Sequence, residues 1–192
     1  FNKGEIVADG ETNKIINLYL NQHIQTRPTL EKTVLENIKE EKLFLRTKFF
    51  EIDKITVSGK NGVPKLDFNS DEEINVIISF RCFKEVMNFR LGILVDVGRR
   101  CQILSSLFTD DERMVHHTKL KTGEYTWECK IPANFFGKNQ YFFTVQMLEH
   151  SIHHLFFKKI FLVNVNFVGY NNVSECVEGN SPVKQKFNWI EK

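Results

Sequence analysis

The sequence predicts an all-β fold, an antiparallel β-sandwich of jelly-roll or immunoglobulin-like topology, preceded by a short helical linker. Three observations predict it. Alternating apolar and polar runs recur between positions 48 and 169 at a spacing of about 10 residues, with turn residues between them. Phe accounts for 18 of the 192 residues, and aromatic side chains suit the pleated surface of a strand. A chain of this length buries enough surface to fold without disulfide bonds.

The clearest pattern lies in the stretch 123–149, which predicts two strands. Their alternate positions hold Tyr125, Trp127, Cys129 and Ile131 in the first run and Tyr141, Phe143, Val145 and Met147 in the second. A period of two places each set on one face of its strand, so both sets are expected to face one core. Pro132, Asn134 and Gly137 interrupt the pattern between the strands and predict a connection longer than a tight hairpin.

The other predicted strands flank this pair. They cover residues 49–57, 66–68, 74–83, 91–96, 101–108 and 156–168, with a weaker segment at 115–120. In the run 74–83 the inward set is expected to be Ile74, Val76, Ile78, Phe80 and Cys82. An Asn61-Gly62 pair marks the turn after the first strand.

The ends of the chain differ from this central part. Residues 4–10 predict a strand and residues 12–23 a capped helix. Thr29 is expected to cap a second helix, in which Leu30, Val34 and Ile38 follow at four-residue steps. The tail 183–190 alternates like a strand and carries Phe187 and Trp189, so it is expected to add to its own sheet or to a partner's. We therefore expect four parts: a strand and helix in 1–23, a helical linker in 24–47, the β-sandwich in 48–169 and a C-terminal tail in 170–192.

Composition excludes several classes of function. The formal net charge of +2 gives no electrostatic footprint for nucleic acid. The four cysteines lack C-x-x-C spacing, and we expect reduced thiols in a cytosolic protein. No run of 18 apolar residues is present, and the start Phe1-Asn2-Lys3 resembles the cut end of a longer chain.

The sequence predicts no enzyme and no cofactor, because no phosphate-binding loop, nucleophile elbow or zincin motif is present. His150, His153 and His154 have the spacing of metal ligands, but a solvated loop explains them better and we predict no metal site. The acidic cluster 110–112 is interpreted as solvated surface.

The second face of the strands offers a candidate binding surface. Its non-core positions hold Arg81, Phe83, Arg90, Phe142, Gln146 and Phe156. Such mixtures bind sugars, because rings stack against C–H bonds while planar polar groups bond neighbouring hydroxyls. The pattern alone favours a simpler interpretation, in which these side chains only cover a second sheet or lie singly on the surface. The candidate site residues are Arg81, Phe83, Arg90, Phe142 and Gln146.

Several stretches resemble a known family. The opening K-G-E-I-V-A-D-G (3–10) and the helix that follows resemble the last strand and helix of an ABC-transporter ATPase domain. The strand 52–57, the motif L-G-I-L-V-D (91–96), the motif G-E-Y-T-W-E-C-K-I-P (123–132) leading into N-Q-Y-F-F-T-V (139–145), and the closing Trp189 resemble the C-terminal extension of ATP-binding subunits that export O-antigen and related polysaccharides. Where that family often has Gly just before the second strand, this chain has Lys138-Asn139.

The resemblance implies a function. In that family the extension is a β-sandwich that recognises the finished glycan, often at its modified non-reducing end, and so selects the polymer for export. It also implies a homodimer, in some members with exchanged C-terminal strands, a membrane subunit as partner, and a place in the cytoplasm at the inner membrane. The alternative is a sandwich that only dimerises or docks on the transporter and has no glycan pocket.

Overall fold

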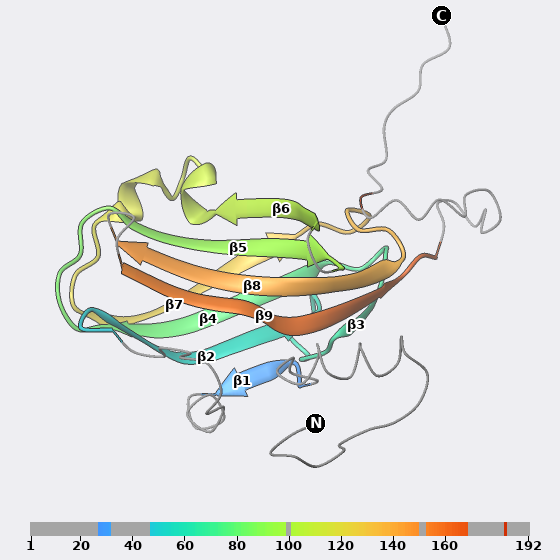
Figure 1. Ribbon diagram of the computed structural model, residues 1–192, viewed down its shortest axis with the longest axis horizontal. Coiled ribbons are helices and arrows are strands. Elements are labelled where there is room, and N and C mark those ends of the chain that lie inside the picture. The colour runs from blue at the N-terminus through green and yellow to red at the C-terminus, as the bar shows by residue number, and fades with distance from the viewer. Residues whose placement is uncertain (1–26, 32–46, 99–100, 150–152, 169–182, 184–192) are drawn as a thin grey trace, which may run out of the picture.

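The computed structural model describes residues 27–31, 47–98, 101–149, 153–168 and 183, which form two facing β-sheets (Figure 1). Both sheets bury their inner faces in one core, which confirms the predicted β-sandwich. The described strand pairs are antiparallel, except that β3 runs parallel to β9. The elements predicted in 4–23 and 184–190 lie outside the described residues, and the domain boundaries remain predictions.

The four-stranded sheet has the order β1-β2-β4-β7. Its strands are β1 (Thr29–Glu31), β2 (Phe50–Ser58), β4 (Ile74–Cys82) and β7 (Gly123–Ile131). β4 lies between β2 and β7 and pairs with β7 over its whole length. β7 is therefore an edge strand of the described sheet.

The five-stranded sheet has the order β3-β9-β8-β5-β6. Its strands are β3 (Asp67–Asn69), β5 (Phe89–Val97), β6 (Cys101–Leu107), β8 (Asn139–Glu149) and β9 (His153–Asn166). β8 is central and β6 is an edge strand, opposite β7 in the other sheet (Figure 1). Two 3₁₀ turns, η1 (Phe108–Asp110) and η2 (Val115–Thr118), lie in the connection from β6 to β7.

The core follows the predicted alternation of side chains. The inward set of β4 is buried throughout: Ile74, Val76, Ile78, Phe80 and Cys82. In β8 the inward set is fully buried as well: Tyr141, Phe143, Val145 and Met147. In β7 only Ile131 is buried, while Tyr125, Trp127 and Cys129 pack against the core and remain partly exposed. The prediction of which face points inward is therefore confirmed, but β7 is covered only in part.

Two tyrosines fix the starts of β7 and β8 in the same way. The Tyr125 hydroxyl donates a hydrogen bond to the Lys121 carbonyl at 2.9 Å, and the Tyr141 hydroxyl donates to the Gly137 carbonyl at 2.6 Å. Each bond reaches back four residues and closes the turn before the strand, as tyrosine corners do in β-sandwiches. Burial raises the pKa of Tyr141, so its hydroxyl stays a donor.

The side of the sandwich at β3 is closed by a corner that leads into β4. The Phe68 ring is buried, and the Lys65 ammonium lies 4.7 Å from its centroid. Lys65 also donates to Glu72, whose other oxygen accepts the Asn69 backbone N–H at 2.7 Å. The Lys65 hydrogen bond, followed by the Asn69 N–H, lowers the pKa of Glu72. Ionised Glu72 therefore links the Lys65 side chain and the Asn69 backbone, and these two bonds hold the corner together.

Two sequence predictions are wrong where the structure describes them. Thr29–Glu31 forms strand β1 rather than the start of a helix, because Leu30 pairs with Ile55 and is fully buried. Sheet pairing outweighs the apolar spacing here. The predicted weak strand at 115–120 is instead η2, followed by an isolated bridge between Leu120 and Val86. The remainder of the predicted helix lies outside the described residues.

Cys82, Cys101 and Cys129 are free thiols. Burial raises the pKa of Cys82 and of Cys129. Among the described residues, no helix has the length and apolar character needed to cross a membrane.

Candidate functional site

The five predicted site residues lie on two sheets rather than on one surface. Arg81 lies on the outer face of the four-stranded sheet, where its guanidinium pairs with Asp53 at 3.4 Å and Glu124 at 3.3 Å. Phe83 follows β4, and its backbone N–H donates to the Phe49 carbonyl. Arg90 belongs to the other sheet, which faces away from Arg81. The expectation of one surface is wrong because β4 pairs with β2 and β7, and the chain crosses to the other sheet before β5 begins.

Three of the predicted residues share the outer face of the five-stranded sheet. Gln146 pairs in register with Gly92 on one side and Phe156 on the other, while Phe142 pairs with Asp96. Arg90 is exposed and donates to the Thr109 hydroxyl at 3.2 Å. Phe156 is 45% exposed, which makes it the most open aromatic ring among the described residues of this face. We call this face, defined by Arg90, Phe142, Gln146 and Phe156, the outer surface.

A bulge in β9 shapes this surface. Three residues, 158–160, lie opposite the single residue Thr144, whose hydroxyl accepts the Lys159 backbone N–H at 2.8 Å. Lys159 takes a φ of 51°, and its ammonium lies 4.9 Å from the centroid of the Phe142 ring. The same ammonium donates to the Gly98 carbonyl at 3.1 Å. Lys159 therefore covers part of the Phe142 ring, and Phe156 is the more open of the two rings.

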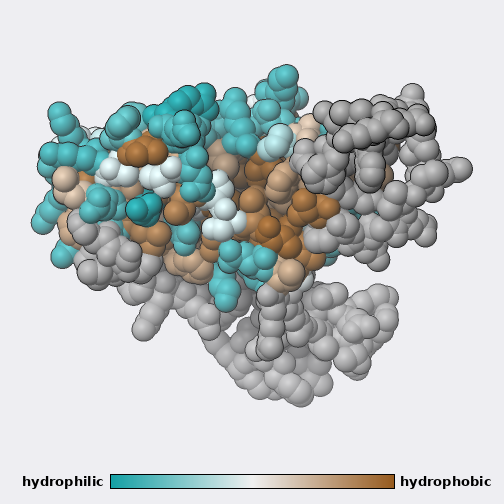
Figure 2. Space-filling model, turned by 90° about the horizontal axis from the view of Figure 1, so that it is seen from above, coloured by the Kyte–Doolittle hydropathy of each residue, from teal (hydrophilic) through white to brown (hydrophobic). Residues whose placement is uncertain are grey.

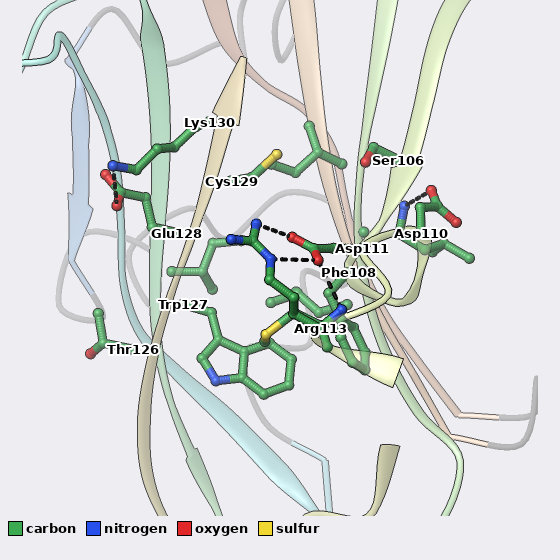
Figure 3. A pocket seen from close by; sticks show the side chains of 16 residues that line it. Ser106, Phe108, Asp110, Asp111, Arg113, Thr126, Trp127, Glu128, Cys129 and Lys130 are labelled. Atoms are coloured by element: carbon green, nitrogen blue, oxygen red, sulfur yellow. Dashed lines mark hydrogen bonds and ion pairs between the residues drawn. The ribbon is translucent and has the colours of Figure 1, made fainter. Parts of the chain in front are cut away.

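A groove opens at the side of the sandwich between β6 and β7, with a volume of about 870 Å³. Both strands are edge strands in the described chain, so no strand closes the gap between their sheets. Trp127, Cys129 and Ser106 turn toward the middle of the groove (Figure 3). Thr126, Glu128 and Lys130 also line it, from the other side of β7. The groove is therefore lined by the partly covered inner face of β7.

An aromatic wall and a charged pair border the groove. The Phe108 and Trp127 rings are 4.7 Å apart between centroids and tilted by 56°. Arg113 donates to both oxygens of Asp111, at 2.9 Å from Nε and 2.6 Å from Nη2, and the pair lies over the groove (Figure 3). These bonds hold the pKa of Asp111 at about 2. The pair is therefore ionised at neutral pH and carries no net charge.

The other end of this side is apolar. Figure 2, seen from above, shows an apolar area near the end where β6 begins and β7 finishes. At that end of the strands, Val97 ends β5, Ile103 and Leu104 lie near the start of β6, and Cys129 lies near the end of β7, all partly buried against the core. Val183 forms an isolated antiparallel bridge with Phe136 beside this area. Val183, which is the residue of the segment 170–192 that the structure describes, therefore lies at the connection between β7 and β8.

Sequence reasoning missed the groove. The sequence predicts that Trp127 faces the core and that Asp111 lies at solvated surface. The alternation in 123–131 gave the inward direction of Trp127, but no sequence signal indicated that its strand lies at an edge. His150 lies outside the described residues, and β9 begins at His153.

Comparisons with known proteins show a likeness of fold. No family model matches the chain, and no curated protein matches it by sequence. Among solved structures, the chain is similar to the one titled "Crystal structure of the C-terminal domain of wzt", with a TM-score of 0.55 and 8% sequence identity. The match covers 82% of this chain and 99% of that one. The structure is therefore a β-sandwich of the kind found in the C-terminal domain of wzt.

Proposed function

We propose that this chain is a non-catalytic carbohydrate-binding domain attached to the ATP-binding subunit of a polysaccharide-exporting ABC transporter. The observation that carries the proposal is the fold, which matches nearly the whole C-terminal domain of wzt. The sequence resemblance of 123–145 to the extension of such subunits, and of 1–23 to the end of an ATPase domain, supports the same context. In that context the domain works in the cytoplasm, next to the membrane subunit at the inner membrane.

The proposed ligand is a finished O-antigen-type polysaccharide, recognised at its modified non-reducing end. Binding would select the polymer and couple its presence to export. A hydrated sugar exchanges hydrogen bonds with water for hydrogen bonds with protein at little net gain. Affinity at a single site is therefore expected on the order of micromolar to millimolar.

The outer surface is the proposed glycan site. Phe156 provides an exposed ring, and the Gln146 amide beside it provides a donor and an acceptor. Arg90 adds an exposed guanidinium on the same face. Arg81 lies on the four-stranded sheet and Phe83 follows its strand β4, so the proposed site does not include them.

A matched pair of arginine variants tests the proposal. The ligand is the lipid-free polysaccharide isolated from the cells that encode the chain, titrated into labelled protein and followed by NMR. We expect Arg90→Ala and Phe156→Ala to weaken binding at least about tenfold, which corresponds to about 1.4 kcal/mol. Arg81→Ala, an exposed arginine on the opposite face, should leave it unchanged. No saturable shift at millimolar polysaccharide would overturn the proposed function.

The second candidate function is assembly. The bridge between Val183 and Phe136 places Val183 next to the apolar connection from β7 to β8, where Phe135 packs against the core. A tail strand from this chain or from a second copy could pair there, which would give a homodimer or a docking domain. Light scattering on the chain shortened by residues 183–192 tests it: a dimer that becomes monomeric supports the role, and an unchanged mass excludes it.

A further inference from the structure

The groove between β6 and β7 is bordered by charged side chains that are not needed for packing of the core. Trp127 and Phe108 form its aromatic wall, and the Arg113–Asp111 pair lies over it (Figure 3). Arg113 contributes little to packing, because its side chain is 87% exposed. We propose that the groove is a second saccharide subsite, separate from the outer surface, which takes an uncharged sugar ring of the same polymer. This inference rests on the proposed function.

The size and openness of the groove suit such a ligand. Its volume of about 870 Å³ lies within the range of about 300–1,000 Å³ that is common for ligand sites. Along β7, the described chain supplies a partner strand on one side only, β4. The other side presents backbone N–H and C=O groups, which can bond hydroxyls of a bound sugar.

The side chains supply both parts of sugar recognition. The partly exposed Trp127 indole and the Phe108 ring offer apolar surface for the C–H face of a pyranose. The bonds from Nε and Nη2 of Arg113 to Asp111 leave Nη1 without a partner among the described residues. Asp111 Oδ1 also accepts the Arg113 backbone N–H at 3.0 Å, so the free groups of the pair are the Nη1 donor and the second lone pair of Oδ2 as acceptor. Each of these can bond one sugar hydroxyl.

The charges favour a neutral ring. The guanidinium of Arg113 is already neutralised by Asp111, and Asp110 accepts the Leu107 backbone N–H at 2.8 Å. Lys130, which also lines the groove, is paired with Glu128 at 3.4 Å. An anionic group would therefore meet more carboxylates than free cations here, whereas on the outer surface it would meet Arg90 and Lys159 beside the carboxylate of Asp96. The two sites therefore differ in the charge that they accept.

The two sites are also connected. Gly92 and Leu107 line the groove, and they are paired in register on β5 and β6. A Cβ placed on Gly92 would lie 3.1 Å from the Gln146 amide nitrogen, so Gln146 on the outer surface lies directly beside them. A polymer that leaves the groove past Leu107 arrives at Gln146, and one chain can occupy both subsites.

Fluorescence of Trp127 gives a direct test. The sequence has two tryptophans, and Trp189→Phe leaves Trp127 as the only reporter. The polysaccharide described above is titrated while acrylamide quenching of Trp127 and the shifts of the outer surface are followed in the same protein. We expect quenching to fall about twofold at saturation. Arg113→Ala should weaken affinity about tenfold and remove this protection, while Arg81→Ala, also an ion-paired arginine, should do neither.

The remaining outcomes separate this inference from the proposed function. If the polysaccharide shifts the outer surface and Arg113→Ala and Trp127 quenching show no effect, the subsite is wrong and the proposed function stands. If the polysaccharide binds nowhere, the proposed function fails and the subsite with it. If Trp127 is shielded in the free protein and becomes accessible when residues 183–192 are deleted, the tail fills the groove and the subsite is excluded.

Discussion

β7 and β8 have the same alternating sequence pattern but differ in burial. In β8 the inward residues Tyr141 and Phe143 are fully buried, because the strand lies between β9 and β5 and faces the other sheet. In β7 the inward residues Tyr125 and Trp127 remain partly exposed, because the strand lies at an edge opposite another edge strand. The alternation of apolar and polar residues therefore predicts which face of a strand points inward. Whether that face is fully buried depends on the strand that lies opposite it in the other sheet.

This difference separates stability from recognition. A covered apolar side chain stabilises the fold by leaving water, whereas a half-covered aromatic side chain keeps surface free for a ligand or another strand. The sandwich places the first kind at its centre and the second kind at the side between β6 and β7. The predictions below test this contrast, beginning with the largest expected effect.

Phe143→Ala should cost about 3–5 kcal/mol of unfolding free energy, because it leaves a cavity in the centre of the core. Tyr125→Ala removes a similar ring from β7 and should cost less than half as much, since that ring is already partly hydrated. Urea unfolding of both variants measures the difference. Equal losses would show that β7 is covered in solution and that the contrast between the strands is wrong.

Gly92→Ala should cost about 1–3 kcal/mol, since its Cβ would lie 2.7 Å from the Leu107 side chain and 3.0 Å from the Ser106 carbonyl. Both contacts belong to the edge strand β6. If β6 can move away from β5, the loss of unfolding free energy lies near the lower end of this range, and changes in NMR chemical shift extend along β6. A matched Gly62→Ala variant, which meets no atom within 4 Å but has a φ of 75°, gives the cost of backbone strain alone.

Much of the fold was predictable because burial leaves a local pattern. In β4 and β8, every inward residue that the alternation predicts is buried. The short strand at Thr29–Glu31 was missed because its conformation depends on pairing with Ile55, which lies far along the chain. The four-residue spacing of Leu30, Val34 and Ile38 is a local pattern, so it could not predict pairing with a distant strand.

The candidate site was predictable only in part, because it depends on which strands share a sheet. Arg90, Phe142 and Gln146 share one face, but the chain crosses between sheets after Cys82, so Arg81 is on the other sheet. The residues between the two strands fit a hairpin as well as a crossing. The groove was missed for the same reason, since nothing near Trp127 in the sequence identifies the strand across from it.

The two tyrosine corners give a smaller and closely matched comparison. Tyr141→Phe leaves the Gly137 carbonyl without its buried donor and should cost about 1–2 kcal/mol. Tyr125→Phe removes the same type of bond at an exposed position, where water replaces the hydroxyl, and should cost less than about 0.5 kcal/mol. Thermal unfolding of both variants at one pH measures the two losses of stability. A larger loss for Tyr125→Phe would mean that the turn before β7 is more buried than its neighbours indicate.

The smallest expected effect compares the two sides of the sandwich through their ion pairs. Lys65 lowers the folded-state pKa of Glu72 at the closed side, so ionised Glu72 contributes stability above its unfolded pKa, and this contribution is lost as the pH falls through the folded pKa. The pair is partly exposed, so Glu72→Gln should cost less than about 1 kcal/mol at pH 7, and the difference from the wild type should shrink on acidification. Asp111→Asn at the open side removes a solvent-exposed pair, which contributes little to stability because water screens it, so the free energy of unfolding should stay close to that of the wild type between pH 4 and pH 7. The folded-state carboxyl, with a pKa of about 2, stays ionised across that window. Urea titrations across this range compare the two variants. A pH-dependent loss for Asp111→Asn with none for Glu72→Gln would assign the structural role to the open side and contradict the division proposed here.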